Sequence, residues 1–186
     1  MSSWRDMLER LVAERGRALF GYAYVLTGNR PEAEDLLQDA LVRAFRSGRS
    51  ATSVDAAHVY VKKAIASAFV DSGRRASVRP QHSDESIEEL LGARAAGVAD
   101  ATLASDAALD LHAAILTLGV RERTCVVLRY MEDLRVDDIA GVLGVAPGTV
   151  KRYLYEAIQR LRAVIPELEF GEHDVTDVQI RPGGAR

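Results

Sequence analysis

The fold is decided by the stretch VDDIAGVLGVAPGTVKRYLYEAIQRLRAVI, which covers residues 136–165. Its apolar residues recur at three- and four-residue spacing, which predicts a short helix, a tight turn at Gly144 and a longer second helix. Gly144 can adopt the positive φ that such a turn needs, and the small Ala140 lets the two helices cross closely. Val145 is expected to fill the angle between them. The pattern therefore predicts a helix-turn-helix.

The second helix of this motif has two unlike faces. The inward face is apolar, at Val150, Leu154, Ile158, Leu161 and Ile165. The outward face carries Thr149, Lys151, Arg152, Tyr155 and Gln159. These residues suit the major groove of DNA, because hydroxyl and cationic groups bind phosphates and guanine edges, and an aromatic ring contacts thymine methyl groups. The alternative is a plain helical hairpin with a solvated basic face.

The charge of the chain is unevenly distributed. The 186 residues carry a formal net charge of −3, which at first argues against nucleic acid as a partner. By segment the net charge is +4 over residues 1–79, −6 over 80–118, +2 over 119–165 and −3 over 166–186. Two basic segments thus alternate with an acidic connector and an acidic tail, an arrangement that permits local binding of phosphates.

Three further helices are predicted in the N-terminal part, where apolar stripes recur at helical spacing and strand-like alternation does not. The first ends at Gly28, a suitable left-handed cap, and has the stripe Leu8, Leu11, Val12, Leu19, Tyr22, Ala23 and Leu26. The second starts at Pro31 and has Ala33, Leu36, Leu37, Ala40, Leu41, Ala44 and Phe45 inward. The third is expected from about Val54 to Asp71, with Val54, Ala57, Val61, Ala64, Ile65, Ala68 and Phe69 inward.

Two of these helices have outward faces with distinctive chemistry. On the second helix the apolar Val42 lies among Asp35, Gln38, Asp39 and Arg43, a mixture that suits a protein interface. An incidental exposed valine is the alternative. On the third helix a basic, partly aromatic face carries Tyr60, Lys63, Ser67 and Arg74, with Lys62 and Arg75 beside it. Such a face could bind phosphates and stack the bases of a single strand, although a plain solvated basic face is again the alternative.

These patterns together predict an all-α protein of two small helical domains joined by a flexible linker, the C-terminal domain being a helix-turn-helix. The first domain is expected over residues 1–75 and the second over 109–165, where two helices, Leu109 to Leu118 and Arg121 to Tyr130, precede the motif. The connector over 76–108 is rich in acidic and small residues, with a short helix near Ile87 to Leu91. Residues 166–186 are expected to form a polar tail.

Several classes of protein and site are not expected. No apolar run reaches membrane-spanning length and the first residues lack the apolar stretch of a signal peptide, which predicts a cytoplasmic protein. The single cysteine, Cys125, is predicted to be a core residue, and the absence of a Cys or His cluster argues against a metal site or another cofactor. Scattered histidines and the lack of a glycine-rich phosphate loop argue against catalysis and a small-molecule substrate.

Two stretches of the chain carry a family resemblance. TGNRPEAEDLLQDALVRAF and YVKKAIASAFVDSGRR, residues 27–45 and 60–75, resemble the second conserved region of extracytoplasmic-function (ECF) sigma factors, which direct bacterial RNA polymerase to promoters. The motif at residues 136–165 resembles their fourth conserved region. The resemblance covers roughly residues 5–75 and 109–165, and the order of the two regions and the acidic connector also fit.

The resemblance implies three binding surfaces and two macromolecular partners besides DNA. Core RNA polymerase, through its beta and beta-prime subunits, would be bound by Asp35, Gln38, Asp39, Val42 and Arg43. The promoter −10 element would be bound by Tyr60, Lys62, Lys63, Ser67, Arg74 and Arg75, with a flipped base held by the loop from Ser47 to Val54 and no nucleotide hydrolysis needed for melting. The −35 element would be bound by Thr149, Lys151, Arg152, Tyr155 and Gln159. An anti-sigma factor is the other expected partner.

The sequence departs from the family pattern at Tyr153 and Glu156, where many members carry arginine. Glu156 would repel phosphates if it faced the DNA backbone, but it could accept a hydrogen bond from cytosine N4 if it faced a base edge. The sequence leaves both interpretations of Glu156 open.

Two other classes of DNA-binding protein fit the sequence less well. A response regulator needs a receiver domain of alternating strands and helices, and a ligand-responsive repressor needs a pocket and a dimerisation segment.

Overall fold

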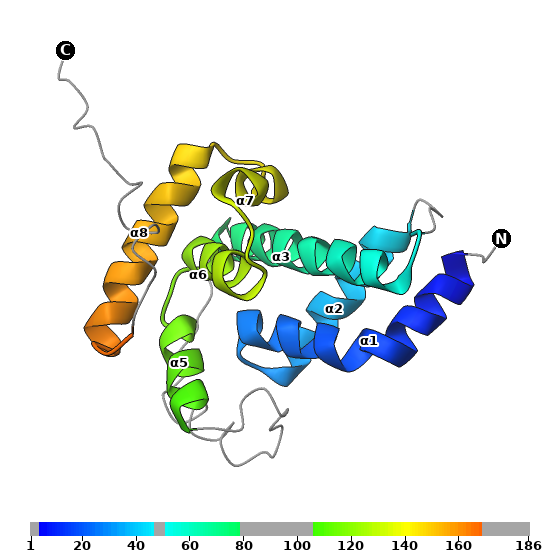
Figure 1. Ribbon diagram of the computed structural model, residues 1–186, viewed down its shortest axis with the longest axis horizontal. Coiled ribbons are helices and arrows are strands. Elements are labelled where there is room, and N and C mark those ends of the chain that lie inside the picture. The colour runs from blue at the N-terminus through cyan, green and yellow to red at the C-terminus, as the bar shows by residue number, and fades with distance from the viewer. Residues whose placement is uncertain (1–3, 47–50, 79–105, 169–186) are drawn as a thin grey trace.

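The computed structural model describes residues 4–46, 51–78 and 106–168, and every regular element within these ranges is a helix. The elements are α1 (Trp4–Thr27), α2 (Arg30–Phe45), α3 (Val54–Val78), α5 (Asp106–Leu116), α6 (Val120–Val126), η2 (Val127–Met131), α7 (Val136–Leu143) and α8 (Pro147–Val164). The predicted all-α fold class is confirmed. In Figure 1, α1 and α2 lie on one side and α5 to α8 on the other, and α3 reaches across to α6 and α7.

Parts of the sequence-based prediction fall on residues 47–50, 79–105 and 169–186, which lie outside the described residues. They are half of the loop predicted to hold a flipped base, the short helix near Ile87 to Leu91 and nearly all of the acidic tail.

The first three helices enclose one core, as their apolar stripes predict. Leu11, Leu19 and Leu26 of α1 and Val61 and Ile65 of α3 are completely buried in it. The stripe prediction is wrong at Val12, which is 48% exposed. Each residue turns an α-helix by about 100°, so the side chain after Leu11 already points away from the core.

Two residues join α1 to α2, and the first, Gly28, acts as the sequence predicts. Gly28 adopts a φ of +81° and its N–H donates to the carbonyl of Tyr24 at 2.8 Å. Asn29 then caps α2, because its side-chain oxygen accepts from the N–H of Glu32 at 2.9 Å, and Pro31 follows in the first turn. The abrupt turn brings α2 back against α1 and α3 and leaves its other side facing solvent.

The third helix is longer than predicted and is buried on a second side. It was expected to end near Asp71 but continues to Val78. Ala66 and Val70, which the predicted stripe does not include, are 0% and 6% exposed. The reason is tertiary: the C-terminal helices cover this side, so Ala66 belongs to their core. Contacts of this kind leave no trace in the local periodicity of α3.

The segment before the helix-turn-helix differs in detail from the two helices predicted there. The first, α5, begins three residues earlier than expected. The second is a continuous stretch of α6 and η2, close to the predicted range, whose last five residues form a wider π-helical turn. Asp133 follows with a φ of +49°, and the N–H of Leu134 donates to the carbonyl of Leu128 at 3.1 Å. The wide turn directs the intervening Glu132 toward α3.

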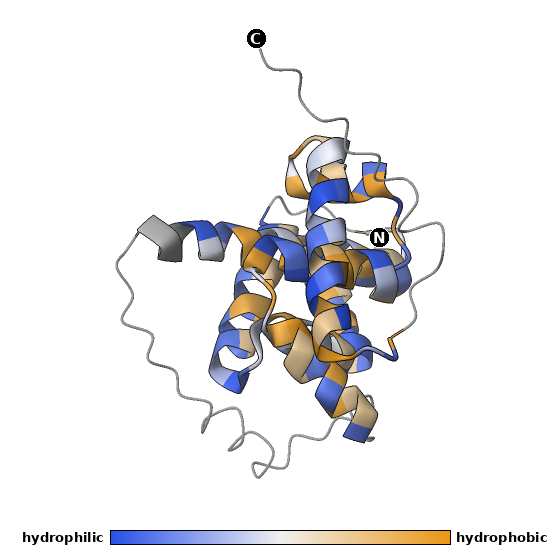
Figure 2. Cartoon of the chain, turned by 90° about the vertical axis from the view of Figure 1, so that its left-hand side faces the viewer, coloured by the Kyte–Doolittle hydropathy of each residue, from blue (hydrophilic) through white to orange (hydrophobic). Residues whose placement is uncertain are grey.

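The helix-turn-helix itself is confirmed. Gly144 adopts a φ of +64° at the end of α7, and the N–H of Val145 donates to the carbonyl of Ala140 at 3.1 Å. Four predicted core positions of α8 are buried, namely Val150, Leu154, Ile158 and Leu161. The fifth, Ile165, is only half-buried because α8 ends one residue before it. In Figure 2, which faces α8, hydrophilic and hydrophobic residues alternate along the helix.

Candidate protein and nucleic-acid interfaces

The predicted protein interface on α2 is open to solvent. Its residues follow one side of the helix at three- and four-residue spacing, and we call them the α2 surface: Asp35, Gln38, Asp39, Val42 and Arg43. Val42 is 65% exposed, which is the highest value among the large apolar side chains that the structure describes. An apolar side chain this exposed gains little from the fold of its own domain, because the hydrophobic contribution scales with the area removed from water.

Arg43 gives the α2 surface a fixed arrangement of charge. Its guanidinium binds Asp39 at 2.8 Å and Asp71 of α3 at 3.0 Å. The hydrogen bond to Asp39, supported by Asp71, raises the pKa of Arg43. The two carboxylates hold the arginine beside Val42 in one conformation, and a preordered side chain loses less entropy when a partner binds.

The basic face of α3 is only partly open. Its described members, which we call the α3 surface, are Tyr60, Lys62, Lys63, Ser67 and Arg74; the side chain of Arg75 lies outside the described residues. Tyr60 is 58% exposed and Arg74 is exposed, whereas Lys63 and Ser67 are half-buried. The two ends of this face are therefore exposed to solvent, while its middle is partly covered by other parts of the protein.

Lys62, a member of the α3 surface, is bound by a residue from the C-terminal half of the molecule. Its ammonium binds the carboxylate of Glu132 at 2.7 Å, and the two side chains are only 21% and 16% exposed. The ammonium also lies 5.3 Å from the centre of the Tyr22 ring, within the range of a cation–π contact. Burial, with the charge of Glu132 as a smaller cause, raises the pKa of Tyr22, so its ring is that of a neutral phenol.

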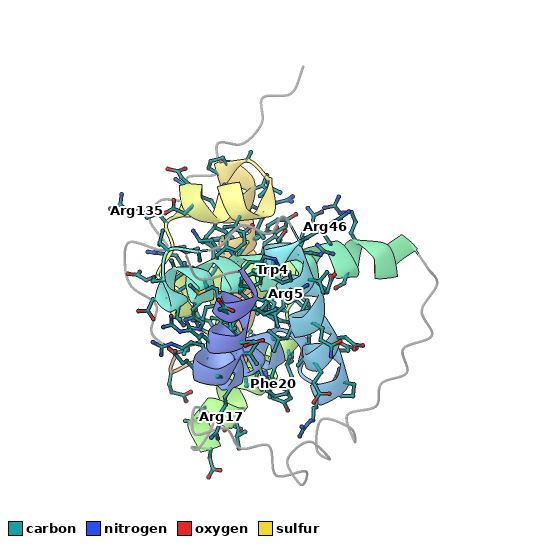
Figure 3. All side chains as sticks on the ribbon, turned by 90° about the vertical axis from the view of Figure 1, so that its right-hand side faces the viewer. Trp4, Arg5, Arg17, Phe20, Arg46 and Arg135 are labelled. Carbon is teal, nitrogen blue, oxygen red and sulfur yellow. The ribbon has the colours of Figure 1, made fainter. Side chains whose placement is uncertain are left out.

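The predicted DNA-reading face of α8 points away from the core. Arg152, Tyr155 and Gln159 are exposed, and Thr149 and Lys151 are half-buried near the start of the helix. Figure 3 labels Arg135, which precedes α7 and projects outward beside it. The motif thus presents a row of polar, aromatic and cationic groups at the helix N-terminal half, where the helix dipole also favours an anion.

The two departures from the family pattern have separate structural roles. The hydroxyl of Tyr153 accepts a hydrogen bond from Arg121 of α6 at 3.1 Å, which turns this residue toward the domain rather than outward. Glu156 lies 4.0 Å from the guanidinium of Arg152, one turn earlier on α8. Arg152 also lies 5.2 Å from the centre of the Tyr153 ring. Both departures therefore constrain the arginine that is predicted to contact DNA.

Arg123 joins the two halves of the molecule, a role that none of the sequence patterns predicted. Its guanidinium donates to the carbonyl of Leu26 near the end of α1, at 2.5 Å, and to those of Leu116 and Leu118 at 2.6 and 3.1 Å. It also lies 5.7 Å from the Phe69 ring, and burial lowers its pKa. A signal existed in the sequence, because Arg123 lies three residues after Val120 and so falls on an apolar stripe.

Other kinds of site have little support in the part of the chain that the structure describes. Within residues 4–46, 51–78 and 106–168, no group of three or more His, Cys, Asp or Glu side chains could hold a metal ion. Over the same residues no helix has the length and apolar character of a membrane span. Cys125 is fully buried, as predicted, and burial raises the pKa of its thiol to about 12.

Comparison with known proteins matches both halves of the molecule. The family model for sigma-70 region 2 matches residues 11–79, and the model for sigma-70 region 4 matches residues 108–161. The RNA polymerase sigma-E factor of Streptomyces antibioticus is 31% identical, over 83% of this chain and 82% of its own length. The ECF RNA polymerase sigma factor SigM of Mycobacterium tuberculosis is 29% identical, over 90% and 81%.

The fold has a solved counterpart. The sigma factor RpoE of Bartonella quintana, crystallised in complex with the anti-sigma factor NepR, superposes with a TM-score of 0.58 over 87% of this chain and 98% of its own, at 20% identity. A region 2 and a region 4 in one all-helical chain define a sigma-70 type transcription initiation factor. The chain belongs to the ECF group of this family. It therefore binds core RNA polymerase and recognises promoter DNA at the start of transcription.

Proposed function

We propose that three helices of this sigma factor each bind a different partner. The α2 surface binds core RNA polymerase, the α3 surface with Arg75 binds the −10 element, and the outward face of α8 binds the −35 element. The observation that carries the proposal is the separation of the three surfaces. Each lies on a different helix, opposite that helix's own buried stripe, and each has a chemistry suited to a different partner.

On α2 the partner is a protein. Val42 offers an apolar centre and the Asp39–Arg43 pair offers a fixed polar edge, which is the usual arrangement of an interface core and its rim. The beta and beta-prime subunits of core polymerase are the proposed partner. On binding, Val42 loses the water that it keeps in the free chain.

On α3 and α8 the partner is promoter DNA. The exposed ring of Tyr60 can stack a base of the opened −10 strand, while Lys62, Lys63 and Arg74 contact its phosphates. On α8, Arg152 reaches a base edge of the −35 element and Lys151 and Thr149 reach the backbone. Because opened bases are captured as they flip, the binding energy offsets an unstacking cost of roughly a few kcal/mol per base and no hydrolysis is needed.

The remaining features of the proposal concern regulation and location. An anti-sigma factor is the proposed inhibitor, supported by the solved complex of RpoE with NepR. The protein acts in the cytoplasm, where polymerase and promoters are, and it works by binding rather than by catalysis. The thiol of Cys125 is buried and its pKa is raised, which fits a packing role for this residue.

The experiment that tests the proposal changes the α2 surface. In one variant Val42→Arg is combined with Asp39→Lys; in a matched control Val12→Arg is combined with Glu9→Lys. Both pairs are three residues apart on exposed sides of helices, so the two variants share the same chemical change. Their thermal stability should stay within about ±0.5 kcal/mol of the parent, as for most surface changes.

Pull-down of core polymerase and run-off transcription then measure function. The α2 variant should lose most polymerase binding, because a long cation replaces the valine at the interface and would be buried unpaired, at a cost of roughly 2–5 kcal/mol. The α1 control should bind and transcribe like the parent. If the α2 variant keeps full activity, the polymerase surface is elsewhere; if the parent does not bind polymerase, the proposed function fails as a whole.

A further inference from the structure

A groove lined by arginines opens where α3, α6 and α8 meet. Helix α6 packs against both of the other two. The groove has a volume of about 390 Å³, within the range of roughly 300–1,000 Å³ that is usual for small-molecule sites. Each helix contributes one arginine to its lining: Arg74 of α3, Arg121 of α6 and Arg160 of α8. We call it the arginine groove.

The arginine groove has an excess of positive charge. Among the described residues that line it, Glu122 is the one carboxylate; it is only 9% exposed and accepts from Arg160 at 2.6 Å. Asp71, which lies outside the lining, binds Arg74 at 3.3 Å but also binds Arg43 at 3.0 Å. A cleft lined mainly by one sign of charge concentrates ions of the opposite sign. The groove therefore favours an anion.

Two of the arginines are positioned by the protein and keep further hydrogen-bond donors. Arg121 donates to the hydroxyl of Tyr153 at 3.1 Å, and Arg160 donates to Glu122. Tyr153 and Arg160 are seven residues apart, so they lie on the same side of α8, two turns from each other. A guanidinium has five N–H donors in a planar fork that matches the oxygens of a phosphate. Each of these arginines can therefore bind a phosphate in addition to its protein partner.

The rest of the lining is suited to an organic group. Val70 and Gly73 of α3 and Val120 of α6 form one apolar wall. Gly73 lies so close to α6 that a Cβ atom on it would be 2.8 Å from Cγ1 of Val120. The side chain of Tyr153 lines the groove as well. A bare inorganic anion would leave this apolar surface uncovered, whereas an organic phosphate would cover it.

The arginine groove is separate from the face of α8 that is proposed to bind the −35 element. Arg152 and Tyr155 of that face point outward, whereas Tyr153 and Arg160 line the groove. Arg121 is half-buried within it. A small molecule can reach such a side chain more readily than the backbone of a DNA duplex can. The chemistry therefore favours a small ligand over promoter DNA.

We propose that the arginine groove binds a small phosphorylated molecule. Its phosphate is held by Arg121, Arg160 and Arg74, and its organic part packs against Val70 and Val120. The site does not depend on the roles proposed above for the three binding surfaces, although it shares Arg74 with the α3 surface.

Titration of the full-length chain with inorganic pyrophosphate and with ADP, at constant ionic strength, tests the site. Calorimetry measures the affinity, and amide NMR spectra show where the ligand binds. We expect both compounds to bind and to shift the amide signals of Gly73, Gly119 and Val120, which line the groove. Adenosine, which has no phosphate, should bind much more weakly than ADP.

Three substitutions test which groups hold the phosphate. Arg121→Gln keeps an amide that can donate to Tyr153 but loses the charge, so it should weaken pyrophosphate binding about tenfold, the size expected for one charge-assisted hydrogen bond. Arg121→Lys keeps the charge but loses the planar fork, so its loss should be smaller. Tyr153→Phe leaves every charge in place and removes only the acceptor that positions Arg121; it should also cause a smaller loss.

Arg10→Gln is the matched control, because it changes the net charge equally at an exposed arginine of α1. Circular dichroism and thermal melting show that each variant is folded. The proposal is overturned if pyrophosphate does not bind, if Arg10→Gln weakens binding as much as Arg121→Gln does, or if adenosine binds as well as ADP. Amide shifts confined to the start of α8, near Thr149 and Lys151, would also overturn it, because the anion would then occupy the DNA-binding face.

Discussion

The basic faces of α3 and α8 look alike in sequence but differ in the fold. Each has an aromatic residue and two adjacent cations on a helix with an apolar opposite side. On α3, however, the Lys62 side chain is 21% exposed and bound at 2.7 Å by a carboxylate from the other half of the molecule. On α8, the Arg152 side chain is 59% exposed and its nearest carboxylate, at 4.0 Å, is on the same helix.

The difference shows that a cationic stripe does not reveal by itself whether it is available to a ligand. A surface pair such as Arg152–Glu156 contributes little and exchanges readily with water or phosphate. A largely buried pair such as Lys62–Glu132 has already lost its water, so removing one partner leaves the other charge poorly solvated. The α8 face is thus open to solvent, while the α3 face is partly engaged by another part of the protein.

The largest expected effect comes from removing Arg123, whose hydrogen bonds join the two halves of the molecule. Arg123→Ala leaves the carbonyls of Leu26, Leu116 and Leu118 without their cationic donor, and each hydrogen bond to a charged group contributes about 1.5–3 kcal/mol. We expect the single thermal transition of the parent to shift down and to split in two as the halves uncouple. Differential scanning calorimetry measures both changes.

Arg10→Ala is the matched control for this prediction. Arg10 is an exposed arginine whose contact is a 3.6 Å surface pair with Glu14, so its loss should change the melting temperature very little. If Arg123→Ala melts like the Arg10→Ala control, the two halves are not coupled through this residue, and the contrast between α3 and α8 needs another explanation.

An effect of intermediate size on DNA binding is expected from substitutions on the outward face of α8. In holoenzyme bound to a promoter fragment, Arg152→Ala should cost about 1–3 kcal/mol of discrimination at the base it contacts. Lys151→Ala should weaken binding to all sequences similarly and lower the slope of log affinity against log salt by about one unit. Affinity measured over a salt series distinguishes the two; unchanged affinity and slope in both variants would remove α8 from the interface.

The smallest expected effect is a dependence of the protein's stability on pH, which arises from a histidine buried between α5 and α1. His112 of α5 lies 5.4 Å from the Tyr24 ring of α1, and its burial lowers its pKa, helped by Arg123 and opposed by carbonyls of Val25 and Tyr24. The folded state thus favours the neutral imidazole. Its contribution to stability is complete above the ordinary histidine value of about 6.5 and is lost as the pH falls below that value.

Thermal melting at several pH values between 7.5 and 5.5 measures how steeply the stability falls with pH. The parent should lose stability as the pH falls, and His112→Gln should flatten the decline. His58→Gln is the comparison variant, since the pKa of His58 is also lowered, first by burial and then by Lys62, but it lies on α3 rather than on α5. An identical slope in the parent and the His112→Gln variant would show that His112 does not titrate within the interface.

Much of the fold could be predicted because it depends on local rules. The stripes of α1, α2 and α8, the cap at Gly28 and the turn at Gly144 all follow from which residues are apolar at helical spacing and which accept positive φ. The errors have equally local causes: Val12 is one residue off its stripe, and Ile165 lies just past the end of its helix. The residue assignments of the three binding surfaces stay predictions.

The sequence by itself determined the helices, the helix-turn-helix and the family, since each is encoded in residues close together in the chain. Only the tertiary structure decided which charged groups meet across the molecule. Lys62 and Glu132 are 70 residues apart, and Arg123 binds Leu26 from 97 residues away. Such pairs depend on how two buried surfaces fit, and helical periodicity carries no information about a partner on another helix. For that reason the sequence predicted a basic face on α3, and the fold revealed that the face is engaged by the protein itself.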